Sequence, residues 1–243
     1  MQELSIKAKE LSFRTKEAYR ILRSNIEFSG DHIQTIAFTS CTPNEGKSSI
    51  SLELARVFAQ NGNRVLMIDA DLRKSVMRTQ FANGKVEYGL TNYLVGKCSA
   101  AQATCKTNED GFDIMLSGPS TPSPSELLNS ERFTTLLKES KEKYDYIIVD
   151  TPPLGSVIDS AIVGKFCDGT VVVVSSGEIS YRFVQNVLEQ LQRADCRILG
   201  CVLNKVEMGS GKGYYGKYYG KYYGKYYGKY YGKYYGNYGD GET

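Results

Sequence analysis

A short run of residue types suited to binding phosphate occurs at positions 41–48, which read CTPNEGKS. The run has the spacing of the P-loop pattern G-x-x-x-x-G-K-[ST], with Cys41 in the place of the first glycine. In such a loop the backbone N–H groups surround phosphate oxygens, Lys47 reaches the β- and γ-phosphates, and Ser48 offers a hydroxyl to Mg²⁺. The pattern therefore predicts a nucleotide site formed by Pro43, Asn44, Glu45, Gly46, Lys47, Ser48 and Ser49.

Three carboxylates follow apolar runs that have the composition of buried strands. Asp69 and Asp71 follow the run VLMI at 65–68, and Asp150 follows YIIV at 146–149. Carboxylates at strand ends beside a triphosphate can bind Mg²⁺ or accept the proton of a hydroxyl nucleophile. Asp150 has the form of a Walker B aspartate, which supports the water shell of the metal. The alternative for Asp69 and Asp71 is a solvated strand end with acidic caps.

The rest of the composition excludes several kinds of chemistry. The chain has one histidine, His32, so Ser-His-Asp catalysis and multi-histidine metal sites are not expected. Its six cysteines form no C-x-x-C pair and are predicted to be reduced thiols. The N-terminus is polar and the apolar runs are far shorter than the roughly 20 residues of a membrane span, so we expect neither secretion nor a transmembrane helix.

Strand and helix patterns place these residues at the edge of a sheet. Five runs rich in Val, Ile and Leu alternate with helical patterns, which is typical of parallel strands covered on both faces. We therefore predict the α/β class, with a mostly parallel sheet, helices on both faces and a P-loop NTPase architecture. Ligands of such sheets bind at the carboxyl ends of the strands, where Lys47, Asp69 and Asp150 would meet. The predicted strands are 33–40, 64–69, 146–150, 170–175 and 198–204, and the predicted helices are 47–61, 125–128, 130–143 and 181–193.

The chain divides into three parts by composition. Residues 1–30 are polar and helix-friendly, 31–208 hold the P-loop and the strand patterns, and 209–243 are dominated by tyrosine, glycine and lysine. The last part holds 13 of the 19 tyrosines and repeats Tyr-Tyr-Gly-Lys without an aliphatic residue, so it is predicted to be disordered. Its six lysines against Asp240 and Glu242 give it a net charge of +4, which leaves −1 for the first 208 residues. A near-neutral body does not predict nucleic-acid binding.

Together these motifs resemble those of the bacterial tyrosine kinases, P-loop kinases that control capsular and exopolysaccharide synthesis. SCTPNEGKS at 40–48 is similar to the family's P-loop, DADLR at 69–73 to its D-x-D-x-R motif, and DTPP at 150–153 to its Walker B segment. The tyrosine-rich C-terminus is similar to the family's autophosphorylation cluster. The resemblance covers essentially the whole chain and is closest to the streptococcal, Firmicute-type kinases, whose activating segment is supplied by a separate transmembrane protein.

The resemblance implies an ATP-dependent tyrosine kinase that phosphorylates itself. It assigns ATP and Mg²⁺ as cofactors, catalysis to Lys47, Asp69, Asp71 and Arg73, and metal binding to Ser48, Asp71 and Asp150. Asp69 is the first choice to take the tyrosine proton, although Asp69 and Asp71 can exchange roles. The expected phosphorylation sites are Tyr214, Tyr215, Tyr218, Tyr219, Tyr222, Tyr223, Tyr226, Tyr227, Tyr230, Tyr231, Tyr234, Tyr235 and Tyr238.

The resemblance also implies partners. Glu17, Arg20 and Arg23 are similar to the family's E-x-x-R-x-x-R segment, which joins subunits into a homo-oligomeric ring. Their three-residue spacing places the charges on one helix face, and the alternative is a solvated face with a local Glu17–Arg20 pair. The further expected partners are a transmembrane adaptor of the polysaccharide co-polymerase type and a cognate protein-tyrosine phosphatase. The expected location is the cytoplasm, at the inner face of the membrane.

Two other functions fit parts of the sequence. A partitioning or division-site ATPase would share the P-loop, but the signature lysine of that group, five positions before Lys47, is Thr42 here. A non-catalytic nucleotide-binding scaffold would have its tail phosphorylated by another kinase. The sequence contains neither H-R-D nor D-F-G, so kinase activity would have to come from the P-loop site.

Overall fold

The computed structural model of the chain describes residues 2–7 and 10–206. The chain divides into two compact units, Met1–Asn204 and Lys205–Thr243. All of the described helices and strands belong to the first unit. The tyrosine-rich segment, with its predicted disorder and its predicted phosphorylation sites, lies outside the described residues.

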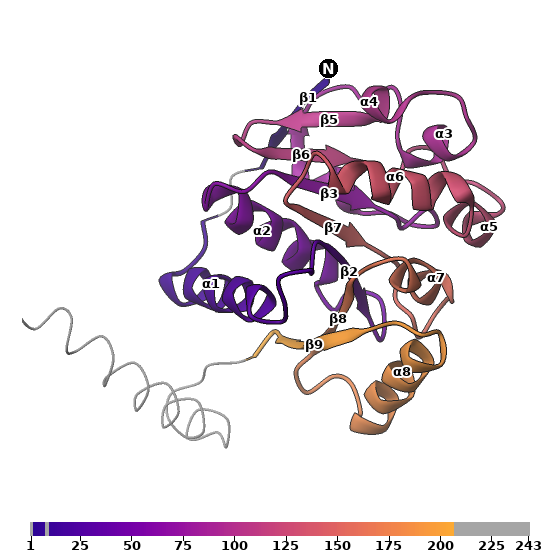
Figure 1. The fold of residues 1–243 in the computed structure, drawn as a ribbon. Coiled ribbons are helices and arrows are strands. Elements are labelled where there is room, and N and C mark those ends of the chain that lie inside the picture. Colours follow the sequence, from indigo (N-terminus) through magenta and orange to yellow (C-terminus); the bar gives the residue numbers. More distant parts are fainter. Residues whose placement is uncertain (1, 8–9, 207–243) are drawn as a thin grey trace, which may run out of the picture. The chain divides into compact units, whose positions relative to one another are not determined.

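Nine strands of the described residues form one sheet, in the order β4-β1-β5-β6-β3-β7-β2-β8-β9 (Figure 1). The strands are β1 (Gln2–Ile6), β2 (Thr35–Ser40), β3 (Val65–Asp69), β4 (Phe81–Asn83), β5 (Thr104–Thr107), β6 (Phe112–Met115), β7 (Tyr146–Asp150), β8 (Gly169–Ser175) and β9 (Ile198–Asn204). Neighbouring strands are parallel except in the pairs β1–β4 and β5–β6. The strands β3, β7 and β2 lie side by side and parallel in the middle of the sheet.

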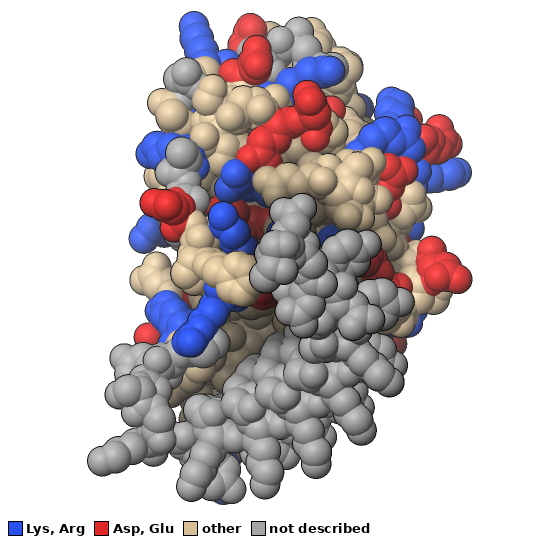
Figure 2. Space-filling view, turned by 90° about the vertical axis from the view of Figure 1, so that its left-hand side faces the viewer, with Lys and Arg blue, Asp and Glu red and all other residues tan. Residues whose placement is uncertain are grey.

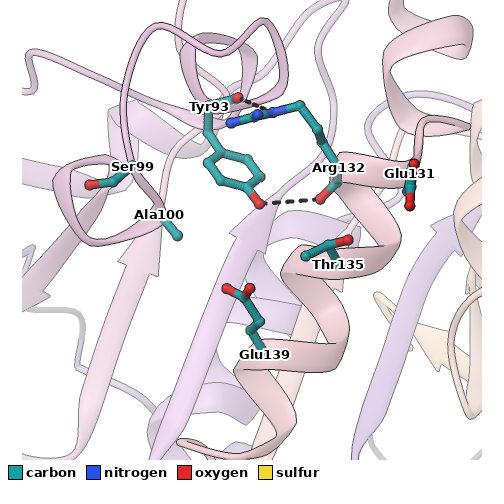
Figure 3. A pocket seen from close by; sticks show the side chains of 7 residues that line it. All are labelled: Tyr93, Ser99, Ala100, Glu131, Arg132, Thr135 and Glu139. Atoms are coloured by element: carbon teal, nitrogen blue, oxygen red, sulfur yellow. Dashed lines mark hydrogen bonds between the residues drawn. The ribbon is translucent and has the colours of Figure 1, made fainter.

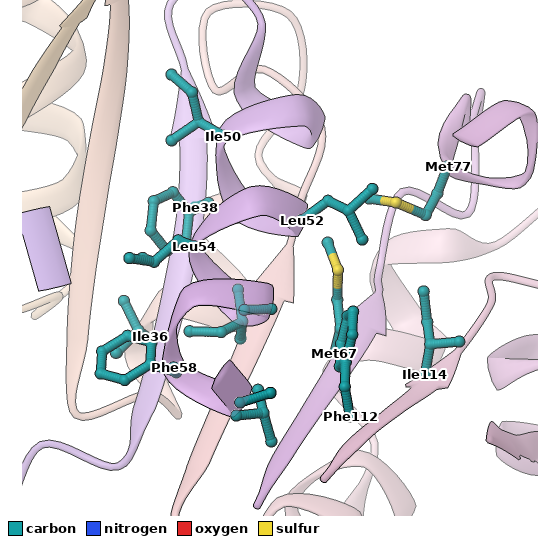
Figure 4. Close-up of a cluster of buried hydrophobic side chains, with 14 of the residues drawn as sticks. Ile36, Phe38, Ile50, Leu52, Leu54, Phe58, Met67, Met77, Phe112 and Ile114 are labelled. Atoms are coloured by element: carbon teal, nitrogen blue, oxygen red, sulfur yellow. The ribbon is translucent and has the colours of Figure 1, made fainter. Parts of the chain in front are cut away.

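Helices cover both faces of this sheet. They are α1 (Phe13–Glu27), α2 (Lys47–Gln60), α3 (Leu90–Leu94), α4 (Ala100–Ala103), α5 (Pro124–Leu128), α6 (Glu131–Lys141), α7 (Asp159–Lys165) and α8 (Tyr181–Arg193), with a 3₁₀ helix η1 (Met77–Gln80). Phe38 of β2 packs in one buried cluster with Ile50 and Leu54 of α2 (Figure 4), and its neighbour Ala37 lies in a second cluster with Phe133 of α6. Successive strand residues point to opposite faces, so α1 and α2 cover one face and α3, α6, α7 and α8 the other. Among the described helices, none combines the length and the apolar character that a membrane crossing needs.

The central elements agree with the sequence-based expectation. The α/β class with a mostly parallel sheet and helices on both faces is confirmed, and each of the five predicted strands and four predicted helices is found within two residues of its expected ends. The elements without a predicted counterpart are short. They are β1, η1, β4, β5, β6, α3 and α4, which lie before α1 or between β3 and α5, and α7 after β7. Such elements depend on pairing with distant residues, which local periodicity does not encode.

The N-terminal segment departs from the predicted helical region 1–30. Only residues 13–27 form the expected helix, and residues 2–6 instead form β1 between β4 and β5. The strand buries Leu4 completely. Asn108 supports the pairing, because its Oδ1 accepts a hydrogen bond from the Ile6 N–H at 2.8 Å and its own N–H donates to the Leu4 carbonyl. The helical prediction was therefore wrong for residues 2–6.

Basic and acidic side chains are mixed on the face of the described part that Figure 2 shows. Exposed ion pairs of the described residues include Arg64–Asp145 before β3 and β7 and Arg193–Glu189 on α8. Exposed pairs of this kind contribute about 0–1 kcal/mol to stability.

Replacing Leu4 with alanine is expected to lower the free energy of unfolding by about 2–5 kcal/mol, because the change leaves a cavity in the buried cluster on one face of the sheet. Urea unfolding followed by circular dichroism measures this change. The matched control is Glu3→Gln, at the exposed neighbouring position, which should stay within about 0.5 kcal/mol of wild type. Equal unfolding midpoints for the two variants would show that β1 is not part of the folded core.

Candidate active site

The carboxyl ends of β2, β7 and β3 lie next to one another at one edge of the sheet. β7 pairs with both neighbours, so that Asp150 lies opposite Phe38 of β2 on one side and opposite Asp69 of β3 on the other. Because the three strands are parallel, the segments that follow them leave the sheet at the same edge. The P-loop, Asp150 and the loop that begins at Asp69 are therefore brought together, as the sequence predicts.

The P-loop turns from β2 into α2 through two backbone positions with positive φ. Asn44 has a φ of 68° and Gly46 a φ of 86°, and both residue types enter the left-handed region more readily than others. A Cβ atom on Gly46 would lie 2.2 Å from Nδ2 of Asn204, so a side chain at position 46 would displace that amide group from its hydrogen bond to the Glu45 carbonyl. α2 begins at Lys47, and its N-terminus presents free backbone N–H groups at the loop. The backbone is thereby shaped to surround an anion.

The Glu45 carboxylate connects the P-loop to the sheet through hydrogen bonds. The Glu45 side chain is almost fully buried, and its Oε2 accepts a hydrogen bond from the N–H of Ser175, at the end of β8, at 2.8 Å. Its Oε1 accepts hydrogen bonds from the N–H and the hydroxyl of Thr42 within the loop. Nδ2 of Asn204, the last residue of β9, donates to the Glu45 carbonyl at 2.8 Å. The Glu45 carboxylate thus shapes the predicted nucleotide loop, and no motif in the sequence marks Ser175 or Asn204 as its partners.

A buried ion pair joins the P-loop lysine to the Walker B aspartate. Nζ of Lys47 lies 2.7 Å from Oδ1 of Asp150, and the two side chains are only 7 % and 2 % exposed. The hydroxyl of Ser51 donates to the same Asp150 oxygen at 3.2 Å, and Nζ of Lys47 also donates to the Ser48 hydroxyl at 3.2 Å. The residues predicted to bind phosphate and metal are therefore within hydrogen-bonding distance of one another.

The oxygen atoms at this point suit Mg²⁺. The Ser48 hydroxyl and the Asp150 carboxylate are hard oxygen ligands, and Mg²⁺ typically takes one or two carboxylates from a protein and its other ligands from water and phosphates. Within residues 2–7 and 10–206, no group of three or more His, Cys, Asp or Glu side chains is placed to hold a metal ion. The donor set fits a metal shared with a nucleotide rather than one held by side chains only.

Asp69 is completely buried, one strand away from Asp150. Its Oδ2 accepts hydrogen bonds from the Ser75 hydroxyl and, at 3.3 Å, from the N–H of Ser117, and its Oδ1 accepts one from the N–H of Asp71 at 3.3 Å. Burial, and after it the negative charge of Asp150, raise the pKa of Asp69 to about 7. A carboxyl group that titrates near neutrality is suited to accept a proton from a hydroxyl group.

Asp71 and Arg73 complete the loop that follows β3. Oδ1 of Asp71 accepts hydrogen bonds from the backbone N–H groups of Arg73 at 3.2 Å and Lys74 at 2.9 Å, so this carboxylate caps the turn. The guanidinium group of Arg73 forms two hydrogen bonds with Asp159, at the start of α7. Asp71 therefore lies in the same loop as Asp69, and Arg73 is tied to a residue that no sequence motif marks.

The remaining predicted nucleotide-binding residues are more exposed. Pro43 and Asn44 are exposed in the loop, and Ser49 is half-buried in the first turn of α2. Their side chains are more open to solvent than those of Glu45 and Lys47, which are almost fully buried.

The predicted oligomerisation residues lie on α1. Arg20 pairs with Glu17, and Arg23 pairs with Glu27 at 3.3 Å, so both ion pairs join residues of the same helix. The Arg20 side chain is 63 % exposed, and Nε of Arg23 is buried without a hydrogen-bond partner among the described residues. Ion pairs within one helix are typical of a solvated helix face. An exposed Arg20 can also contact a second subunit, so the structure is compatible with both interpretations of this helix face.

A separate hollow of about 440 Å³ lies between α6 and the segment that carries α3 and α4 (Figure 3). The guanidinium of Arg132 lies over the ring of Tyr93, 4.8 Å from its centroid, and its Nε donates to the Tyr93 carbonyl at 3.0 Å. The Tyr93 hydroxyl donates to the Arg132 carbonyl at 3.3 Å. These contacts hold α6 against α3. None of the predicted site residues is among those that line the hollow, which are Tyr93, Ser99, Ala100, Glu131, Arg132, Thr135 and Glu139.

Comparison with known proteins agrees with this geometry. Residues 33–199 match the family model described as an AAA domain. The chain is 39 % identical over 222 residues to the tyrosine-protein kinase CpsD of Streptococcus pneumoniae, a match that covers 89 % of this chain and 98 % of CpsD. It is 40 % identical over 220 residues to the tyrosine-protein kinase YwqD of Bacillus subtilis (strain 168), covering 89 % and 92 % of the two chains. The solved kinase domain of the Escherichia coli tyrosine kinase ETK has a TM-score of 0.78 and 33 % identity, covering 86 % of this chain and 85 % of that one.

The fold and the site define a P-loop protein whose sheet edge is built to bind a nucleotide. Within that class, the chain belongs to the bacterial tyrosine kinase family, as its motifs indicate, and is a tyrosine-protein kinase.

Replacing Asp69 with asparagine is expected to change how the free energy of unfolding depends on pH. Between the ordinary pKa of 3.8 and the folded-state pKa of about 7, the native protein holds a proton that the unfolded chain has lost. The contribution of Asp69 to stability therefore falls as the pH rises through this window, by about 1.4 kcal/mol for each unit of pKa difference. Urea titrations between about pH 4 and pH 7 should show wild type losing stability relative to Asp69→Asn.

The control for this prediction is Asp145→Asn. Hydrogen bonds from Arg64 hold the pKa of Asp145 below its usual value, so its contribution changes only at lower pH. Across the window, Asp145→Asn should follow the wild-type slope. Parallel curves for wild type and Asp69→Asn would mean that the pKa of Asp69 is not raised.

Proposed function

We propose that this tyrosine kinase uses ATP and Mg²⁺ to phosphorylate its own C-terminal tyrosine cluster, and that it acts in capsular or exopolysaccharide biosynthesis. The observation that carries the proposal is the meeting of Lys47, Asp150 and Asp69 at the ends of three adjacent parallel strands. A phosphate-binding cation, a metal-binding carboxylate and a proton acceptor are the groups that transfer of a phosphoryl group to a hydroxyl requires.

The P-loop binds and orients the nucleotide in this proposal. Its backbone N–H groups and the N-terminus of α2 surround the β- and γ-phosphates, and Lys47 turns from Asp150 to a phosphate oxygen. Mg²⁺, when bound by Ser48, Asp150 and Asp71, supplies positive charge that neutralises the phosphates. Because positioning and charge neutralisation supply most of the catalysis in phosphoryl transfer, the rigidity of the loop matters directly to the rate.

Asp69 receives the proton in the transfer step. The tyrosine oxygen forms a bond to the γ-phosphorus while the bond between that phosphorus and the β–γ bridging oxygen breaks, and ADP leaves with the electron pair. The hydroxyl proton passes to the Asp69 carboxylate. A pKa of about 7 leaves this group partly ionised near neutrality and able to accept the proton. Asp71, two residues further on, is the alternative acceptor.

The proposal extends to partners. The receiving tyrosines run from Tyr214 to Tyr238, outside the described residues. A ring joined through Glu17, Arg20 and Arg23 would bring the C-terminus of one subunit to the site of the next. A transmembrane adaptor of the polysaccharide co-polymerase type would hold the kinase at the inner face of the membrane, and a cognate phosphatase would reverse the modification.

Replacing Lys47 with methionine is expected to reduce phosphotyrosine formation by about 100-fold or more, because it removes the cation that stabilises the phosphates. The assay incubates purified protein with Mg-ATP and the adaptor's cytoplasmic segment, and then detects phosphotyrosine. Lys97→Met changes an exposed lysine and should keep wild-type activity. Circular dichroism confirms that both variants are folded.

The same assay separates the alternative functions. Release of ADP without phosphotyrosine in the wild-type protein would indicate an ATPase. Nucleotide binding without either product, with the adaptor segment present, would indicate a scaffold.

Replacing Arg20 with glutamate is expected to dissociate the proposed ring. The change removes a local attraction to Glu17 of only about 0.2–0.5 kcal/mol, but it reverses the charge offered to a second subunit. Sedimentation velocity should show the mass distribution shift toward the monomer. Arg193→Glu is the matched control, because Arg193 forms an exposed pair with Glu189 on α8. An unchanged oligomer in Arg20→Glu would assign Glu17 and Arg20 to an ordinary solvated face.

A further inference from the structure

Three segments far apart in the sequence meet at one buried carboxylate. Asp159 begins α7, Ser125 lies in α5, and Arg73 lies in the loop after β3. Nε of Arg73 lies 2.7 Å from Oδ2 of Asp159, and Nη2 lies 3.1 Å from Oδ1. The Ser125 hydroxyl donates to the same Oδ1 at 2.6 Å and accepts a hydrogen bond from Nη2 of Arg73 at 3.1 Å. Both oxygens of Asp159 are therefore satisfied by these two partners.

The burial of Asp159 makes this contact specific. Its side chain is 0 % exposed, whereas that of Arg73 is 40 % exposed. A buried carboxylate is unfavourable unless it is paired and hydrogen-bonded, and the planar guanidinium fork meets both of its oxygens at once, which an ammonium group does not. The position and the orientation of the Arg73 side chain are thus set by α7.

Arg73 in turn belongs to the loop of the proposed proton acceptor. The backbone N–H of Arg73 donates to Oδ1 of Asp71, and the backbone N–H of Asp71 donates to Oδ1 of Asp69. The path from the Arg73 backbone to the Asp69 carboxylate is therefore a short, hydrogen-bonded turn. A displacement of Arg73 would therefore disturb the turn that caps on Asp71 and that donates to Asp69.

The other side of the contact belongs to the segment that follows the Walker B aspartate. Ser160, next to Asp159, donates its hydroxyl to the carbonyl of Pro152, two residues after Asp150. The first turn of α7 is thereby attached to the end of β7. The Arg73–Asp159 pair consequently joins the two loops that carry the proposed proton acceptor and the proposed metal ligand.

We propose that Asp159 is a positioning residue for phosphoryl transfer, which holds Arg73, and through it the loop of Asp69 and Asp71, in register with the Walker B segment. This inference rests on the proposed kinase function. It assigns the Arg73 guanidinium to Asp159 rather than to the nucleotide, so the residue that completes the D-x-D-x-R motif acts on the loop and not on the phosphates.

Replacing Asp159 with asparagine tests the proposal, because it keeps the volume and one acceptor oxygen but removes the charge. We expect kcat for tyrosine phosphorylation to fall about 10- to 100-fold, with KM for ATP within about twofold of wild type, since the P-loop contacts are unchanged. Arg73→Lys keeps the positive charge but loses the planar guanidinium group that meets both Asp159 oxygens. It should likewise lower kcat and leave KM for ATP within about twofold of wild type. The double variant should be no slower than the slower single variant, because both changes break one contact.

The matched control is Asp145→Asn. Asp145 forms a two-point pair with Arg64 between the same strands, β3 and β7, but at their other ends, and both residues are exposed. This variant should keep wild-type kcat and KM. Since Asp159→Asn lies in the core, kcat is referred to the folded fraction measured by circular dichroism at the assay temperature.

Amide hydrogen exchange gives a readout that does not depend on activity. In Asp159→Asn, the amides of residues 70–75 should exchange about tenfold faster or more, while those of α2 should not change. Unchanged exchange in this loop, or a rise in KM for ATP with kcat retained, would overturn the positioning role. A wild-type protein without phosphotyrosine formation would instead overturn the proposed function, and the exchange result would still decide whether Asp159 holds the loop.

Discussion

The architecture of the site depends on the burial of one ion pair, Lys47 with Asp150. Burying two charges is unfavourable unless they meet in good geometry with further hydrogen bonds, which Ser48 and Ser51 provide here. The pair can form only if the strand before the P-loop and the strand that ends at Asp150 are adjacent, parallel and in register, as β2 and β7 are. A slip of one residue would turn Asp150 to the opposite face of the sheet. The order and register of β2 and β7 therefore decide whether this ion pair can form at the edge of the sheet.

The two buried aspartates at this edge differ in their partners. Asp150 faces an ammonium group, whereas Asp69, on the next strand, receives hydrogen bonds from hydroxyl and backbone N–H groups. Burial, and after it the negative charge of Asp150, raise the pKa of Asp69. Asp150 is thus paired with a cation, whereas Asp69 holds a proton more readily than an ordinary aspartate does. Two side chains of the same type are therefore distinguished by their environments.

Local motifs predicted much of this site, because the residues of each motif are neighbours in the chain. The run at 41–48 and the aspartates that end two apolar strands were placed correctly at one edge. The partner of Arg73 could not be predicted, because it acts across a long separation: Asp159 lies 86 positions further along the chain, and nothing around it marks it. β1 was missed for the same reason, since a short polar segment becomes a strand only when β4 and β5 flank it.

The hydrogen bond from Asn204 to Glu45 bears on when the protein becomes competent during its synthesis. It joins positions 159 residues apart, between a loop made early and the final strand of the sheet. A growing chain is delivered from its N-terminus, and contacts of such long separation are the last to be made. An unfinished chain that lacks β9 therefore has its phosphate loop without that restraint. Newly made molecules would have a fully restrained P-loop only once nearly the whole domain, including β9, had left the ribosome.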